Sequence, residues 1–180
     1  KATKLRAIIN VESNFMNNVD YKYCFKKGIH VIATSPVFSK PVAEIALGMT
    51  LSLLRNIHNA HFDFIESKEK YGLESNLKAS LLSEKKIGLV GFGDLARSLY
   101  PLLLPFTKDI NVYDPWVPKK IISKLGFKSI DLNRMFKNCE IIYILAATTK
   151  KNKNLIDKKL LDKMKSNSLF ILMSRAAVVN

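Results

Sequence analysis

Cysteine is scarce in this sequence, and its two examples, Cys24 and Cys139, lie far apart along the chain. They form no Cys-x-x-Cys pair, and no histidine stands near either of them at the spacing of a metal site. A disulfide framework and a cysteine-based metal motif are therefore excluded, and no metal site is expected. Two reduced thiols are the simplest expectation, and they fit a cytoplasmic protein.

Glycine, proline and long apolar runs are also few. The 180 residues include 7 glycines and 6 prolines, and 48% are hydrophobic, which excludes a collagen-like or disordered chain and indicates a packed core. The longest apolar stretch, residues 45–54, is shorter than the roughly 20 residues that cross a bilayer, so no membrane partner is expected. No signal peptide is visible. Both ends look cut, and a fragment of a longer protein is expected.

Acidic residues are outnumbered, with 15 Asp and Glu against 29 Lys and Arg, which gives a net charge of +14. Such a surplus is found in proteins that neutralise nucleic-acid phosphates. The lysines are scattered, however, as at Lys26-Lys27 and Lys119-Lys120, and no basic patch is interleaved with aromatic residues. A solvated surface without a nucleic-acid partner is therefore favoured. The nucleic-acid alternative predicts salt-sensitive retention on DNA.

The first part of the chain contains two strand-like runs, at residues 5–10 and 30–33, with a helix-like segment between them. A loop starting at Thr34 is expected to end at Pro41, which is well placed for the first turn of a helix. The helical pattern then continues to about residue 70, as one helix or two. Its apolar side chains fall near one face and comprise Val42, Ile45, Ala46, Met49, Leu53 and Leu54.

A polar, irregular stretch at residues 71–84 is typical of an interdomain crossing, and a boundary is expected there. Strands and helices then alternate. The strands expected are 87–90, 110–113, 127–130, 141–146 and 169–172, and the helices are 94–105, one from 119, 132–138 and 155–164. This order predicts an α/β fold of the Rossmann type, a doubly wound parallel sheet with helices on both faces. Pro101 and Pro105 are expected to kink the first of these helices or stop it early.

A Gly-x-Gly-x-x-Ala motif, Gly91 to Ala96, follows directly on an apolar strand and opens a helix. Gly91 permits a tight turn, Gly93 lets the backbone approach a pyrophosphate, and the small Ala96 lets the helix pack closely on the strand. The N–H groups and positive dipole end of that helix would face the phosphates. In this position the motif predicts a dinucleotide site.

Asp114 ends the next strand, 21 residues beyond Gly93. This separation is typical of the acid that accepts hydrogen bonds from the adenosine ribose, and its charge disfavours a 2′-phosphate. NAD is therefore expected over NADP, although a cation among the nearby Lys119 and Lys120 would offset the acid. A glycine turn that serves packing alone is the alternative, and the register of strand, turn, helix and acid argues against it.

Several segments together carry a family resemblance. They are Asn17-Asn18-Val19-Asp20, Lys27-Gly28-Ile29, Thr34-Ser35-Pro36, Pro41-Val42-Ala43-Glu44-Ile45-Ala46, Val90-Gly91-Phe92-Gly93, Tyr113-Asp114-Pro115 and Ser174-Arg175-Ala176-Ala177-Val178-Val179-Asn180. In order and spacing they resemble the D-isomer-specific 2-hydroxyacid dehydrogenases across essentially the whole chain.

The resemblance implies an NAD-dependent oxidoreductase that moves a hydride between nicotinamide and C2 of a D-2-hydroxy acid or its 2-oxo acid. Residues 1–55 would end the first half of a flavodoxin-like α/β substrate domain. Residues 56–83 would form the linking helix and interdomain crossing, and residues 84–180 the NAD-binding domain, truncated at its C-terminus. The helix from Pro41 would also take part in a homodimer.

The resemblance further assigns roles to single residues. Arg175 would grip the substrate carboxylate and polarise its carbonyl, because a planar guanidinium makes two charge-assisted bonds; an ordinary surface arginine is the alternative. Backbone N–H groups of Ser13 and Asn14 would bind the same carboxylate, although Asn is also common in loops. The implied cofactor-binding residues are Gly91, Phe92, Gly93, Asp94 and Leu95 at the pyrophosphate, Asp114 at the ribose, Ala146 on the adenine or ribose side, and Met173 and Ser174 on the nicotinamide side.

The sequence departs from the family pattern near its end. The family's acid and proton-transferring histidine lie downstream of the matched arginine, and the chain ends five residues after Arg175. Leu145 stands where relatives have a polar residue, and Ala176-Ala177 replaces Gly-Gly. None of the three histidines is placed to substitute: His30, His58 and His61. This piece alone should not turn over, the particular hydroxy acid stays open, and a non-catalytic NAD-binding sensor or scaffold is the rival hypothesis.

Overall fold

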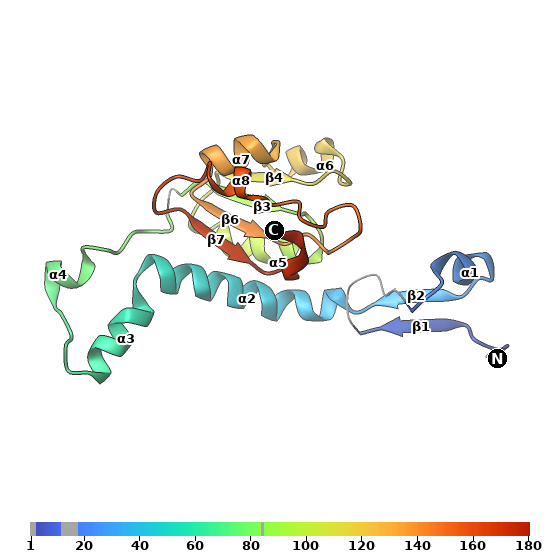
Figure 1. Cartoon of the computed structure of the whole chain (residues 1–180), viewed down its shortest axis with the longest axis horizontal. Helices are drawn as coiled ribbons and strands as arrows, with labels where there is room; N and C mark the ends of the chain where they lie inside the picture. Colours follow the sequence, from blue (N-terminus) through green and yellow to red (C-terminus); the bar gives the residue numbers. More distant parts are fainter. Residues whose placement is uncertain (1–2, 12–17, 84) are drawn as a thin grey trace.

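The computed structural model of the protein describes residues 3–11, 18–83 and 85–180. Within them a parallel pair of strands lies at one end of a long helix, and a five-stranded parallel sheet lies along that helix (Figure 1). The strands are β1 (Ala7–Asn10), β2 (His30–Ala33), β3 (Ile87–Val90), β4 (Ile110–Tyr113), β5 (Lys128–Ser129), β6 (Ile141–Ile144) and β7 (Leu169–Leu172). The larger sheet has the order β5-β4-β3-β6-β7, so the Rossmann-type fold is confirmed.

The helices alternate with the strands of the larger sheet as the sequence predicts. They are α1 (Tyr21–Lys26), α2 (Ser35–Leu54), α3 (Ile57–Ile65), α4 (Gly72–Asn76), α5 (Asp94–Leu103), α6 (Lys119–Lys124), α7 (Leu132–Asn138) and α8 (Lys158–Leu161), with a short 3-10 turn η1 (Ala176–Val178). The helix expected over residues 155–164 is only one turn long, because Ile156 pairs with Val179 in a parallel bridge. The helix α5 continues through Pro101 and ends just before Pro105.

The two faces of the larger sheet have separate cores because successive strand residues point to opposite sides. Ile87 and Leu89 of β3 pack with the helices α2 and α5, whereas Val90 packs with α7. Gly88 also faces α7, and a Cβ there would lie 2.7 Å from the Met135 Cγ. All four β3 residues are buried, as is typical of the central strand of a parallel sheet covered on both faces.

The expectation about the start of the long helix was wrong. The helix α2 begins at Ser35, so Pro41 lies inside it and not at its first turn. The buried face consists mainly of small residues, Ser39, Ala43, Ala46 and Thr50, with Leu54 at its end. Small side chains let α2 approach α5 closely, so the bulkier Ile45, Met49 and Leu53 point outward and are 56%, 46% and 42% exposed.

The early start also lengthens the apolar helix. By length and composition α2 is able to span a bilayer, with a mean hydropathy of 1.4 over an 18-residue window. A core helix of a soluble protein meets the same criterion. Only 28% of that window is buried, and the buried side of α2 packs on α5 and makes a hydrogen bond to β6.

That hydrogen bond joins Thr50 of α2 to Tyr143 of β6. The Thr50 Oγ1 donates to the Ala46 carbonyl at 2.8 Å and lies 2.7 Å from the Tyr143 hydroxyl. Since a threonine hydroxyl has one proton, the Tyr143 hydroxyl is the donor of the second bond. Both side chains are fully buried, and burial raises the pKa of Tyr143 to about 12. The long helix is thus tied to the sheet through a neutral, buried pair.

Removing either hydroxyl tests this pair. Thr50→Val leaves the buried Tyr143 hydroxyl without an acceptor and is expected to lower the free energy of unfolding by about 1–3 kcal/mol. Tyr143→Phe removes the donor and leaves Thr50 bonded to Ala46, so a loss of only about 0.5–1.5 kcal/mol is expected. In urea unfolding the double variant should lose clearly less than the sum of the two. Additive losses would contradict the pairing.

The two cysteines are both buried and unpaired. Burial raises the pKa of the Cys139 thiol to about 12, so this thiol is protonated and unreactive at neutral pH. Neither cysteine is paired in a disulfide in the structure, and the reduced state of the thiols stays a prediction.

Candidate active site

The predicted cofactor residues gather at one edge of the larger sheet, where β3, β4, β6 and β7 end. The Gly91 N–H donates to the Tyr113 carbonyl at 2.8 Å, and the Leu145 N–H donates to the Val90 carbonyl at 2.8 Å. Farther along the edge, the Ser174 hydroxyl donates to the Ala146 carbonyl. Strands β4 and β5 are added on one side of β3, and β6 and β7 on the other. Open α/β sheets bind their ligands at such a switch in strand order, here between β3 and β6.

Gly91 makes the tight turn that the motif predicts. Its φ is +95°, and a Cβ at this position would lie 2.7 Å from both the Cα and the N of Ala146. Ala146 therefore has a second role besides any contact with a ligand, because its backbone packs directly against the glycine turn. Only glycine satisfies both the backbone conformation and this approach.

Gly93 and the start of α5 leave room for an anion. A Cβ on Gly93 would meet nothing within 4 Å, and among the described residues no side-chain hydrogen bond caps the N-terminus of α5. Ala96 is completely buried against the sheet, as the third position of the motif requires. Open space in front of uncapped N–H groups, including that of Leu95, fits the pyrophosphate of a dinucleotide.

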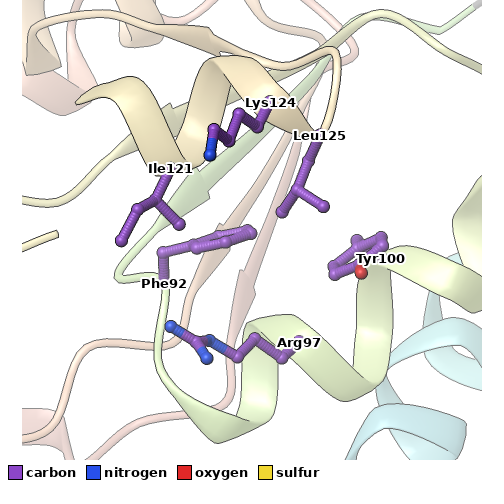
Figure 2. A pocket seen from close by; sticks show the side chains of 6 residues that line it. All are labelled: Phe92, Arg97, Tyr100, Ile121, Lys124 and Leu125. Carbon is purple, nitrogen blue, oxygen red and sulfur yellow. The ribbon is translucent and has the colours of Figure 1, made fainter. Parts of the chain in front are cut away.

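Phe92 contributes to this edge through its backbone and not through its ring. The ring is 1% exposed, stacks on Tyr100 with centroids 6.0 Å apart, and meets Phe127 edge-on at 6.1 Å. It helps to line a surface hollow of about 340 Å³ between α5 and α6. Figure 2 shows Phe92 between Ile121 and Leu125 on one side and Arg97 and Tyr100 on the other. This hollow lies beside the glycine turn and is lined by Phe92, Arg97, Tyr100, Ile121, Lys124 and Leu125.

Asp114 is more firmly held than a simple ribose ligand would be. Its Oδ2 accepts the Phe92 N–H at 2.7 Å, and its Oδ1 accepts the N–H groups of Trp116 and Val117 at 2.7 and 3.0 Å. A carboxylate offers about four lone-pair positions, so three are occupied and one is open. The Phe92 N–H is accordingly engaged by Asp114.

Two loops meet beside Asp114, and the sequence did not point to their contact. The Lys151 Nζ lies 5.3 Å from the centre of the Trp116 ring. In the same loop the buried Thr148 Oγ1 has no hydrogen-bond partner among the described residues. A buried hydroxyl without a partner is a group that a bound ligand can satisfy. No motif relates residues 35 positions apart, so only the fold reveals the pair.

The predicted substrate arginine lies at the same edge. Met173, directly after β7, donates its N–H to the Ile144 carbonyl at 3.0 Å. Arg175 follows two residues later as the exposed residue that opens η1. The other predicted substrate residues, Ser13 and Asn14, lie outside the described residues.

The three histidines are exposed and away from the edge. His30 lies in β2, and His58 and His61 lie in α3, beyond the end of α2 (Figure 1). In the part of the chain that the structure describes, no group of three or more His, Cys, Asp or Glu side chains is arranged to hold a metal ion.

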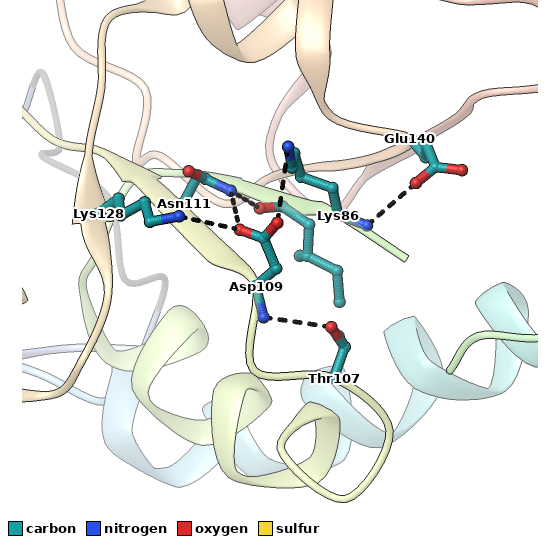
Figure 3. A network of polar contacts seen from close by, with 7 residues as sticks. Lys86, Thr107, Asp109, Asn111, Lys128 and Glu140 are labelled. Atoms are coloured by element: carbon teal, nitrogen blue, oxygen red, sulfur yellow. Dashed lines mark hydrogen bonds and ion pairs between the residues drawn. The ribbon is translucent and has the colours of Figure 1, made fainter. Parts of the chain in front are cut away.

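The opposite edge of the sheet carries a polar network instead of a site (Figure 3). Asp109 accepts a hydrogen bond from the Asn111 amide at 3.2 Å and pairs with Lys86 at 3.6 Å. The Glu140 carboxylate accepts the Lys86 N–H at 3.2 Å, and a hydrogen bond from Lys85 holds the pKa of Glu140 below its usual value. These contacts join the starts of β3, β4 and β6. The acidic residues at this edge, Asp109 and Glu140, therefore have a structural role.

Residues 47–180 match the family described as D-isomer specific 2-hydroxyacid dehydrogenase, NAD binding domain. The chain belongs to this family. The resemblance seen in the sequence is thereby confirmed.

Two curated relatives illustrate the match. The chain is 28% identical over 165 residues to a hydroxypyruvate reductase of Thermotoga maritima, covering 92% of this chain and 52% of that protein. It is 26% identical over 181 residues to a D-3-phosphoglycerate dehydrogenase of Methanocaldococcus jannaschii, covering all of this chain and 34% of that protein. The chain thus spans about half or less of the length of these relatives.

Two solved structures resemble this chain in fold. A phosphoglycerate oxidoreductase from Rhizobium etli is 39% identical with a TM-score of 0.85, covering 98% of this chain and 56% of that one. A D-lactate dehydrogenase from Aquifex aeolicus, complexed with NAD and lactic acid, is 23% identical with a TM-score of 0.82, covering 99% and 52%, and shows the fold alone.

Proposed function

We propose that this chain is the cofactor-binding part of an oxidoreductase that transfers a hydride between nicotinamide and C2 of a D-2-hydroxy acid or 2-oxo acid. The observation that carries the proposal is the glycine turn, in which Gly91 packs on Ala146 while Gly93 leaves open space at the uncapped start of α5. Residues 84–180 form the NAD-binding domain in this proposal. Residues 1–55 belong to the substrate domain, and residues 56–83 connect the two.

The residues at the edge fit NAD better than NADP. The N–H groups of Gly93, Asp94 and Leu95 hold the pyrophosphate, and the open lone pair of Asp114 accepts a ribose hydroxyl. The carboxylate of Asp114 repels a 2′-phosphate. The nicotinamide, beside Met173 and Ser174, supplies or accepts the hydride when the cofactor is bound.

Arg175 binds the substrate in this proposal. Its guanidinium clamps the carboxylate of the 2-oxo acid and stabilises the negative charge that develops on the neighbouring carbonyl oxygen. The proton comes from a group outside this chain, because the three exposed histidines lie on β2 and α3, away from Arg175. Ser13 and Asn14 add backbone N–H groups to the same carboxylate.

The exposed apolar row on α2 and α3 supports a homodimer. Ile45, Met49 and Leu53 of α2 are between 42% and 56% exposed and follow one another at helical spacing. Ile57, which is 54% exposed, opens α3 after a break at Asn56. An apolar row of this kind marks a contact surface. In this proposal a second copy of the protein covers it in the cytoplasm, without a membrane or nucleic-acid partner.

Titration with NADH and NADPH tests the cofactor proposal. Trp116 is the single tryptophan, is 71% exposed and lies two residues from Asp114, so its fluorescence should report binding. NADH is expected to change the emission saturably, and NADPH is expected to bind more weakly. Circular dichroism confirms that the protein tested is folded. Folded protein that responds to neither cofactor contradicts the proposal, and tighter binding of NADPH contradicts the preference for NAD.

Oxidation of NADH with a panel of 2-oxo acids then separates the enzyme from its rivals. Turnover by the intact protein supports the dehydrogenase. NADH binding without turnover supports the sensor or scaffold, and salt-sensitive retention on DNA that is independent of NADH supports the nucleic-acid alternative.

A further inference from the structure

The helices α2 and α5 begin side by side at the cofactor edge and run in the same direction. The Ser35 hydroxyl, at the first residue of α2, donates to the Asp94 Oδ2, at the first residue of α5, over 2.5 Å. One turn farther along both helices, the Ser98 hydroxyl donates to the Ser39 Oγ at 2.9 Å. The two contacts are four residues apart on each helix, so the helices are parallel and in register.

The first of these contacts joins the small sheet to the glycine turn. Thr34, which precedes Ser35, donates its hydroxyl to the Val11 carbonyl at 2.8 Å, just beyond β1. Asp94 directly follows Gly93, the residue that leaves open space for a pyrophosphate. The consecutive residues Thr34 and Ser35 therefore connect the end of β1 to the start of α5, each through its own hydrogen bond.

Asp94 is an unexpected residue for this place because its charge has the same sign as a pyrophosphate. An anion at a helix N-terminus is stabilised by the unpaired N–H groups and by the helix dipole. A carboxylate that turned toward those N–H groups would compete with the phosphates for them. In the structure the Asp94 carboxylate instead meets the Ser35 hydroxyl, and no side chain caps α5.

We propose that Ser35 is a positioning residue for the cofactor, because its hydroxyl holds the Asp94 carboxylate toward α2 and keeps the start of α5 open to the pyrophosphate. The inference rests on the proposed NAD site. This role also makes the affinity for NAD depend on the position of the β1–β2 sheet relative to α5, since Ser35 lies where β2 leads into α2.

Binding of NADH to four variants of the protein tests this role. Ser35→Ala frees the carboxylate and is expected to raise the Kd for NADH about three- to tenfold. Ser35→Thr keeps the hydroxyl and should restore binding. Asp94→Asn removes the competing charge and keeps the backbone N–H that binds the pyrophosphate, so it should bind NADH more tightly than the wild type. In the Asp94→Asn background, Ser35→Ala should then have little effect.

Two further measurements test whether Ser35 orients the Asp94 carboxylate or only stabilises the packing of α2 on α5. Ser98→Ala removes the neighbouring α2–α5 contact, away from the turn, and should leave the Kd unchanged. The penalty of Ser35→Ala should shrink as the salt concentration rises toward about 1 M, because the screening length then falls to about 3 Å and the repulsion between neighbouring exposed charges weakens.

The outcomes are distinguishable. A Ser35→Ala protein that binds NADH as the wild type does, or that loses affinity equally with and without the Asp94 charge, overturns the positioning role and leaves the cofactor site intact. A folded wild-type protein that does not bind NADH overturns the proposed function and this inference with it.

Discussion

Replacing Arg175 by methionine in the intact protein should lower kcat/KM for the 2-oxo acid by about 10²–10³-fold, because a group aimed at developing charge is lost. Arg175 is exposed at the end of β7, on the same edge as the glycine turn, so its loss should not disturb the fold. The Kd for NADH, measured by Trp116 fluorescence, should stay within about twofold of the wild-type value, since surface changes are usually within about 0.5 kcal/mol.

Arg175→Lys is the matched control. Lysine keeps the charge but lacks the planar fork that holds a carboxylate through two bonds, so it should recover only a small part of the activity. Full activity in the methionine variant would show that Arg175 is an ordinary surface residue. A parallel loss of NADH affinity would place it with the cofactor and not with the substrate.

The second large effect is expected from two alanine substitutions in the glycine turn. Gly91→Ala should lower the free energy of unfolding by at least about 2 kcal/mol, because it adds a strained φ and a clash with the Ala146 backbone. Gly93→Ala points its methyl group into open space and should cost less than about 1 kcal/mol. Its Kd for NADH should nevertheless rise about tenfold or more, since the methyl group occupies the pyrophosphate position.

Thermal or urea unfolding without ligand, followed by NADH titration, distinguishes these two glycines. The structure predicts opposite results: Gly91 matters for stability and Gly93 for binding. If Gly93→Ala binds NADH normally, the pyrophosphate does not lie against the start of α5.

The cofactor edge was predictable because its residues are local in the sequence. Gly91, Gly93 and Ala96 lie within six consecutive residues. The spacing from Gly93 to Asp114 reflects one strand–helix–strand unit. Periodicity also gave the alternation of strands and helices. These features depend on the backbone path, which short-range patterns determine well.

The features that the sequence did not reveal depend on which distant segments meet. The apolar face seen in the sequence of α2 did not show which of its residues are buried, because close packing on α5 selects the small Ala43, Ala46 and Thr50. The contacts of Ser35 with Asp94 and of Trp116 with Lys151 join residues without any shared motif. Their identification required the tertiary structure.

The three N–H groups that Asp114 accepts bear on attempts to re-engineer the domain. A change of preference from NAD to NADP would begin by removing the charge of this acid, because that charge repels a 2′-phosphate. Here the same carboxylate fastens the glycine turn to the loop after β4, so an apolar replacement would loosen the turn that either cofactor needs. Asp114→Asn would keep one accepting oxygen but turn an NH2 group toward the remaining N–H donor or donors. A workable redesign would supply another acceptor there and introduce the phosphate-binding cation separately, among the lysines of α6.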